Sequence, residues 1–161
     1  MKPSLPVSIC LPIRKLEKDS CELWLQRRQE NGPLDGTWEF PGGKIEAGES
    51  PPVCGSRELK EETGLSVSWE KLVSFKTYRH DYSDRSVCLF VHLLYFSTQS
   101  EYQKNLDSKG WKQLNYRTPF EAEWAKNVPQ ANKEIITDLA NYLLENIGEN
   151  GWRNLWQQLS C

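Results

Sequence analysis

Three glutamates near the middle of the chain have a spacing that could serve metal-dependent chemistry. Glu58, Glu61 and Glu62 stand at positions i, i+3 and i+4, which places their carboxylates on one face of a helix. In the C-terminal half of that helix the macrodipole disfavours negative charge. Burying such a cluster requires a compensating cation, although three glutamates alone more often form a solvated helix face.

The residues around these glutamates favour a metal site over a solvated face. Glu49 stands just before the helix, Arg57 lies beside the cluster, and the pair Gly42-Gly43 could let a backbone carbonyl approach an ion. Magnesium selects oxygen ligands and is commonly shared between carboxylates and substrate phosphates. The arrangement therefore predicts phosphate chemistry.

The helix that would carry these side chains has clear boundary signals. Ser50 can cap free amide groups, and Pro51 and Pro52 suit a first turn, where a missing amide proton costs nothing. Gly64 is a typical residue for a left-handed helix end. We therefore predict a helix from Ser50 to Thr63.

Apolar and β-branched residues predict a set of strands around this helix. The expected strands are Val7–Ile13, Cys21–Arg27, Trp38–Phe40, Val67–Tyr82, Ser86–Thr98 and Trp111–Leu114. In the second of these, Trp24 and Gln26 would lie on the face opposite to Leu25. Pro129 precedes an amphipathic helix with apolar residues at helical spacing. Strands alternating with a few helices imply a mixed α/β sandwich.

The composition is that of one globular domain. The chain has 161 residues, 38% of them hydrophobic and 26% charged, with a formal net charge of -2, which argues against a surface for long nucleic acids. We find no repeat or linker and treat residues 1–161 as a single domain. Residues from about 147 to 161 would form a helical extension that covers the core or a partner subunit.

The cysteines indicate the compartment rather than a metal site. They are scattered along the chain: Cys10, Cys21, Cys54, Cys88 and Cys161. With only His80 and His92 beside them, a zinc site is not expected. We interpret them as reduced, mostly buried thiols. Because no segment resembles a signal peptide or membrane span, we expect a cytoplasmic protein that does not bind membranes.

The segment from Gly43 to Leu65 resembles the Nudix box, G-x5-E-x7-R-E-U-x-E-E-x-G-U, in which U is aliphatic. Every defined position matches: Gly43, Glu49, Arg57, Glu58, Leu59, Glu61, Glu62, Gly64 and Leu65. The chain is thereby identified as a member of the Nudix hydrolases. The resemblance implies a Nudix-type α/β/α sandwich with a mixed β-sheet, and magnesium as cofactor, for which manganese can substitute.

Segments outside the box are similar to the MutT branch of that family, which hydrolyses oxidised guanine nucleotides such as 8-oxo-dGTP. They are Arg27-Arg28, Trp38–Glu46, Tyr82–Arg85 and Val128–Asn132. This resemblance implies hydrolysis of 8-oxo-dGTP or a related purine nucleotide to the monophosphate and pyrophosphate. By analogy, the cellular role would be nucleotide pool sanitisation in support of DNA repair.

The resemblance also implies a role for each box residue. The expected metal ligands are the carbonyl of Gly42 and the carboxylates of Glu58, Glu61 and Glu62. Arg57 would pair with Glu49 and orient the cluster. Glu58 would take the proton from the attacking water, or position the group that does, while the metal neutralises developing charge.

Side chains outside the box would contact the substrate. They are Arg28, Glu39, Phe40, Tyr82, Arg85 and Asn132. Asn132 would hydrogen-bond the purine edge, Phe40 and Tyr82 would form walls of the base pocket, and the two arginines would contact the nucleotide. As alternatives, Asn132 is equally a helix N-cap, the arginines are surface charges, and the aromatic residues are core or sheet-face residues.

One position departs from the MutT pattern, and it keeps other functions open. Where the branch usually has glutamate before the tryptophan of a late strand, this chain has Gly110 before Trp111. Either Asp107 fills the role of the missing glutamate, or Glu58 acts without such a helper, or turnover is slow. The alternative substrates are an RNA 5′-triphosphate end, another nucleoside triphosphate or a nucleoside diphosphate derivative.

A nucleotide-sensing domain without catalysis is a further alternative. Such a domain would be expected to lose box carboxylates, and this chain retains all of them. The partner we expect is a small nucleotide, bound by a monomer or a homodimer.

Overall fold

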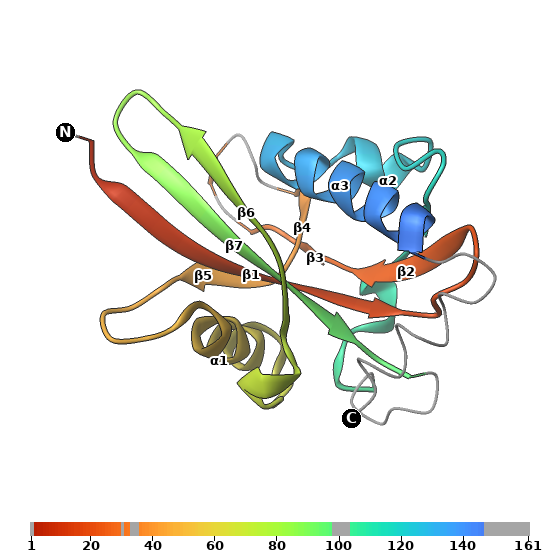
Figure 1. The fold of residues 1–161 in the computed structure, drawn as a ribbon, viewed down its shortest axis with the longest axis horizontal. Helices are drawn as coiled ribbons and strands as arrows, with labels where there is room; N and C mark the ends of the chain where they lie inside the picture. The colour runs from red at the N-terminus through yellow and green to blue at the C-terminus, as the bar shows by residue number, and fades with distance from the viewer. Residues whose placement is uncertain (1, 30, 33–35, 98–103, 147–161) are drawn as a thin grey trace.

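A mixed β-sheet forms the centre of the computed structural model, which describes residues 2–29, 31–32, 36–97 and 104–146 (Figure 1). Its strands are β1 (Ser4–Arg14), β2 (Ser20–Trp24), β5 (Gly42–Lys44), β6 (Val73–Asp81), β7 (Ser86–Tyr95) and β8 (Trp111–Asn115). They follow the order β6-β7-β1-β2-β8, with β5 paired to β1. Only the β1–β7 pair is parallel among these strands. A separate ribbon joins β3 (Gln26–Arg27) to β4 (Trp38–Glu39).

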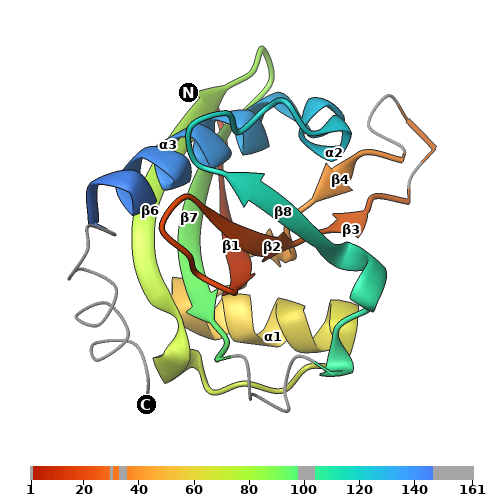
Figure 2. The same ribbon diagram turned by 90° about the vertical axis from the view of Figure 1, so that its right-hand side faces the viewer.

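Helices cover both faces of the sheet. Helix α1 (Pro51–Thr63) lies on one face, and α3 (Gln130–Asn146) with the short α2 (Glu123–Lys126) lies on the other (Figure 2). Two short 3-10 helices, η1 (Trp69–Lys71) and η3 (Ser108–Gly110), complete the described elements. The predicted α/β class with a mixed sheet between helical layers is therefore confirmed.

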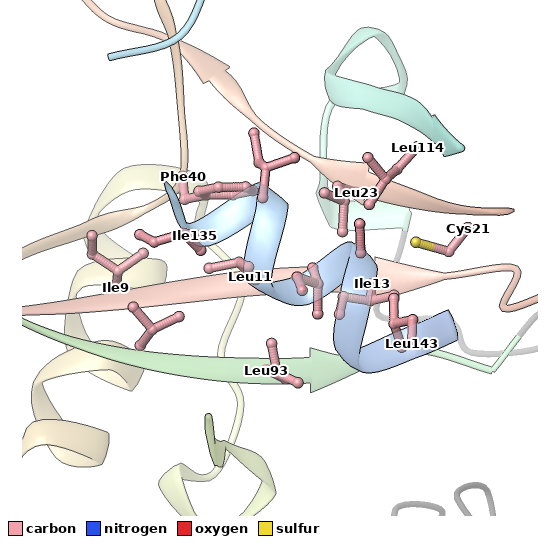
Figure 3. Close-up of a cluster of buried hydrophobic side chains, with 14 of the residues drawn as sticks. Ile9, Leu11, Ile13, Cys21, Leu23, Phe40, Leu93, Leu114, Ile135 and Leu143 are labelled. Carbon is pink, nitrogen blue, oxygen red and sulfur yellow. The ribbon is translucent and has the colours of Figure 1, made fainter. Parts of the chain in front are cut away.

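Strand β1 is buried on both faces because a helix lies above each of them. Ile9, Leu11 and Ile13 point into the core beneath α3, together with Ile135 of that helix (Figure 3). Cys10 lies between these residues in the strand and points to the opposite face. There it belongs to a second cluster of buried side chains, on the α1 side of the sheet. Full burial of an aliphatic side chain contributes about 1.5–3 kcal/mol, so these two clusters hold the three layers together.

The predicted second strand, Cys21–Arg27, is interrupted at Leu25. The amide of Leu25 donates to the carbonyl of Gly110 at 2.9 Å, outside the regular ladder. The chain then leaves the main sheet, and Gln26 pairs with Glu39 in the β3–β4 ribbon. Trp24, on the face predicted to be opposite to Leu25, is 4% exposed because the α1-side cluster covers that face as well.

Other boundaries differ from the sequence prediction in smaller ways. Strand β6 begins at Val73 rather than Val67, because η1 occupies part of the interval. Ser50 occupies the N-cap position of α1 but makes no side-chain capping hydrogen bond there. Gly64 ends the helix with φ of 79°, as predicted.

The remaining expectations concern compartment and the chain end. None of the helices in the described ranges combines the length and apolar composition needed to cross a bilayer. The four described cysteines are free thiols, and Cys10, Cys21 and Cys54 are buried. Cys161 and the extension predicted for residues 147–161 lie outside the described residues.

Candidate active site

Helix α1 presents its charged face beside strand β5. Cys54 and Leu59 are fully buried and fix the inner side of the helix. The carboxylates therefore project away from the core: the Glu58 side chain is 16% exposed and the Glu61 side chain 58% exposed. The predicted spacing of the cluster along the helix is present, but its members have different surroundings.

Two adjacent glycines allow β5 to lie against both the sheet and the helix. A Cβ atom at Gly43 would lie 2.3 Å from Oε1 of Glu58, and one at Gly42 would lie 2.4 Å from the carbonyl oxygen of Ser8. Any side chain at either position would have to displace those atoms. Gly43 thus lets the Glu58 carboxylate rest on the backbone, and Gly42 lets β5 pair with β1.

Arg57 is the centre of an ion-pair network. Its Nε and Nη2 donate to the two oxygens of Glu49 at 2.8 and 2.9 Å, and its Nη1 donates to Glu58 at 3.0 Å and to Glu61 at 3.3 Å. The Arg57–Glu49 pair expected from the resemblance is therefore formed, with two hydrogen bonds. The Arg57 guanidinium, helped by the Glu46 amide, lowers the pKa of Glu49 to about 2.

Glu62 has partners on the opposite side of the cluster. Its Oε2 accepts hydrogen bonds from Nε2 of Gln26 at 2.7 Å and from the amide of Gly42 at 3.2 Å. Although part of the side chain reaches solvent, desolvation of the carboxylate raises its pKa to about 7; the two donors oppose this rise, and the charges of Glu58 and Glu39 add to it. Among the described residues, Glu62 is the carboxylate of the cluster that has no cationic partner.

The carboxylates do not converge on one point. The described residues contain no group of three or more His, Cys, Asp or Glu side chains arranged to hold a metal ion. Glu58 and Glu61 are paired with Arg57, whereas Glu62 is held by Gln26 on the other side of the cluster. The donors are carboxylates, the ligands that magnesium prefers, so the chemistry of the set fits that ion although its present orientation does not.

Phe40 and Asn132 lie on the α3 side of the sheet. Phe40 is 5% exposed and packs beside the first turns of α3, near Ile135 (Figure 3). Helix α3 begins at Gln130, so Asn132 lies within its first turn and is not the N-cap. Asn132 is 6% exposed, and its amide side chain forms no hydrogen bond with the described residues.

The other predicted substrate residues form two separate pairs. Arg28 and Glu39 are joined at 3.2 Å in the β3–β4 ribbon. At the tip of the β6–β7 hairpin, the Arg85 guanidinium lies 5.7 Å from the ring centre of Tyr82 and is paired with Asp84 at 2.9 Å. Tyr82 is 48% exposed, so it is not a core residue.

A groove of about 720 Å³ extends from Glu62 to the β3–β4 ribbon. Its lining includes Trp24, Gln26, Trp38, Glu39, Glu62 and Asp107. Arg27 and Lys112 lie 4.6 and 4.0 Å from the ring centre of Trp38, which concentrates positive charge at the far end.

Trp24 fills the space that a side chain at Gly110 would need. A Cβ atom at Gly110 would lie 2.3 Å from Nε1 of Trp24, and that nitrogen donates to the carbonyl of Asp107 at 2.9 Å. The Asp107 carboxylate accepts from the amide of Lys109 at 3.0 Å and lines the same groove as Glu62. Asp107 therefore lies on the groove wall, and the alternatives expected for the role of the missing glutamate stay predictions.

The sequence prediction missed Gln26. Its alternation with Leu25 indicated the correct face, but only the break between β2 and β3 brings it to Glu62.

Most of this chain is similar in sequence to known proteins. The family profile described as the NUDIX domain matches residues 5–139. The 8-oxo-dGTP diphosphatase of Escherichia coli (strain K12) is 28% identical over 124 residues, which are 77% of this chain and 90% of that protein. The 8-oxo-dGTP diphosphatase of Proteus vulgaris is 38% identical over 72 residues, which are 45% of this chain and 62% of that protein.

Solved structures show the same fold. A mutT/nudix family protein from Listeria innocua superposes with a TM-score of 0.62 at 18% sequence identity, covering 90% of this chain and 97% of the other. At 18% identity this similarity shows a shared arrangement of strands and helices and no more than that.

Proposed function

This chain belongs to the Nudix hydrolase family, and we propose that it hydrolyses an oxidised purine nucleoside triphosphate, 8-oxo-dGTP or a close relative, to the monophosphate and pyrophosphate. Water attacks a phosphorus of the α–β phosphoanhydride, the bond between the α and β phosphates breaks to release the monophosphate and pyrophosphate, and the proton of the water passes to a carboxylate. Such an activity would remove oxidised nucleotides before a polymerase incorporates them.

The observation that carries the substrate proposal is the unpaired amide of Asn132. Asn132 is 6% exposed and its amide makes no hydrogen bond with a described residue, so a base bound there would find an unused donor and acceptor; one such hydrogen bond contributes about 0.5–1.5 kcal/mol. Oxidised guanine carries a hydrogen at N7, where guanine carries a lone pair. The Asn132 side-chain oxygen would accept from the oxidised base, with Phe40 close to the same end of α3.

The box residues would supply the chemistry. The carboxylates of Glu58, Glu61 and Glu62, with the carbonyl of Gly42, would hold magnesium or manganese, which neutralises phosphate charge and acidifies water when bound. Glu58 is our candidate for the base, because Gly43 leaves room for its carboxylate beside β5 and Arg57 donates a hydrogen bond to it. Arg57 would keep the helix face in place through Glu49.

The groove beside Glu62 favours a second candidate. Its volume of about 720 Å³ is in the range of sites that bind drug-sized molecules. Such a groove can hold a group larger than pyrophosphate. A nucleoside diphosphate linked to another group would place that group there, next to Trp38.

A substrate panel separates the two candidates. The purified chain with magnesium is given 8-oxo-dGTP, dGTP and a nucleoside diphosphate sugar, and kcat/KM and the phosphate products are measured. We expect 8-oxo-dGTP to be preferred over dGTP, with pyrophosphate released. Equal rates for the oxidised and normal nucleotides, or release of orthophosphate, would refute the leading proposal.

A further inference from the structure

We propose that Gln26 is a positioning residue for the metal site, because it fixes the Glu62 carboxylate through one oxygen and leaves the other without a donor among the described residues. This inference rests on the metal-dependent activity proposed above, but it concerns a residue outside the Nudix box. Gln26 lies in β3, and its Nε2 is 2.7 Å from Oε2 of Glu62 in α1, 36 positions later in the chain.

Both hydrogen bonds to Glu62 reach the same oxygen. The amide of Gly42 also donates to Oε2, at 3.2 Å, and no described residue donates to Oε1. Two donors on one oxygen fix the rotation of the carboxylate about its terminal bond. The second oxygen is thereby left for a cation, beside the groove that Asp107 also lines.

Gln26 suits this position because it is a neutral donor. It is paired across the β3–β4 ribbon with Glu39, whose carboxylate is itself joined to Arg28 at 3.2 Å. A glutamate at this position would add a third negative charge beside Glu39 and Glu62. A lysine would supply a cation that competes with the metal ion. An amide orients Glu62 without changing its charge.

Metal titration of the full chain without nucleotide tests this role. Free Mn²⁺ is measured by electron paramagnetic resonance for the wild type and for Gln26→Met, which retains length but loses the donor. Loss of a partner that orients a metal ligand typically weakens binding about 10–100-fold, and we expect a value of about tenfold here because the site is partly solvated. Gln29→Met is the matched control, because Gln29 is exposed, lines the same groove and makes no hydrogen bond with Glu62. The Mn²⁺ affinity of this variant should equal that of the wild type.

Turnover at high metal concentration separates positioning from a structural role. If Gln26 acts through the metal, the kcat of Gln26→Met returns to the wild-type value once Mn²⁺ is saturating, whereas a misfolded variant would not recover. An unchanged Mn²⁺ affinity in Gln26→Met, or a kcat that saturating metal does not restore, would overturn the assignment. Absence of Mn²⁺ binding in the wild type would instead overturn the metal site on which the proposed function depends.

Discussion

Replacing Gly43 by alanine would move the Glu58 carboxylate without changing its chemistry. The new Cβ would lie 2.3 Å from Cδ and Oε1 of Glu58 and 2.8 Å from its Oε2. Ordinary contacts begin near 3.4 Å, so the carboxylate must retreat by about 1 Å. Because it is the end of a flexible side chain, the backbone need not shift.

The magnitude of the effect follows from that displacement. A misplacement of about 1 Å at a reacting group can reduce the rate about 100-fold, which corresponds to about 2.7 kcal/mol of transition-state stabilisation. We therefore expect kcat/KM for 8-oxo-dGTP with magnesium to fall about 100-fold in Gly43→Ala. The free energy of unfolding, measured by urea denaturation, should change by less than about 1 kcal/mol.

Two other glycines provide controls for this experiment. Gly48 has φ of 80° and open space around it, so Gly48→Ala should lower stability by about 1–2 kcal/mol but retain the wild-type kcat/KM. At Gly42 the clash is with backbone of β1, so Gly42→Ala should lower stability by about 1–3 kcal/mol. If Gly43→Ala keeps kcat/KM within about threefold of the wild type, the position of Glu58 is not important for catalysis.

Three further predictions concern other parts of the site. Glu61→Gln or Glu62→Gln should abolish magnesium-dependent turnover while circular dichroism shows an intact fold; full activity in both variants would remove the proposed ligands. Asn132→Ala should reduce the ratio of kcat/KM for 8-oxo-dGTP over dGTP by about tenfold, equivalent to 1.4 kcal/mol, and an unchanged ratio would leave Asn132 with a packing role. Gly110→Ala should lower the free energy of unfolding by about 1–3 kcal/mol, because its Cβ would meet Trp24 and the carbonyl of Leu25 at 2.6 Å; an unchanged denaturation midpoint would contradict this packing.

Local signals in the sequence were sufficient for most of the fold. The helix from Pro51 to Thr63 follows from its prolines and from Gly64, and the burial of Ile135 and Ile136 follows from helical spacing. These features depend on neighbouring residues, which is why the sequence reveals them.

Features that depend on packing between distant segments were not predictable. The break at Leu25 depends on a hydrogen bond that its amide donates to the carbonyl of Gly110, and no local residue signals it. The orientation of the box carboxylates is a similar case. Helical spacing correctly placed them on one helix, but the choice between Arg57 and Gln26 as partners depends on where β3 and β5 lie.

The network around Arg57 has a consequence for the protein without its metal. The guanidinium brings one positive charge to the three carboxylates of Glu49, Glu58 and Glu61 and offsets part of their mutual repulsion, so we expect the acidic helix face to fold without an added ion. Chelation would then inactivate the enzyme reversibly, and returning the ion would restore it without a refolding step. Arg57 thus supplies an internal counter-charge, part of which a bound divalent ion would take over.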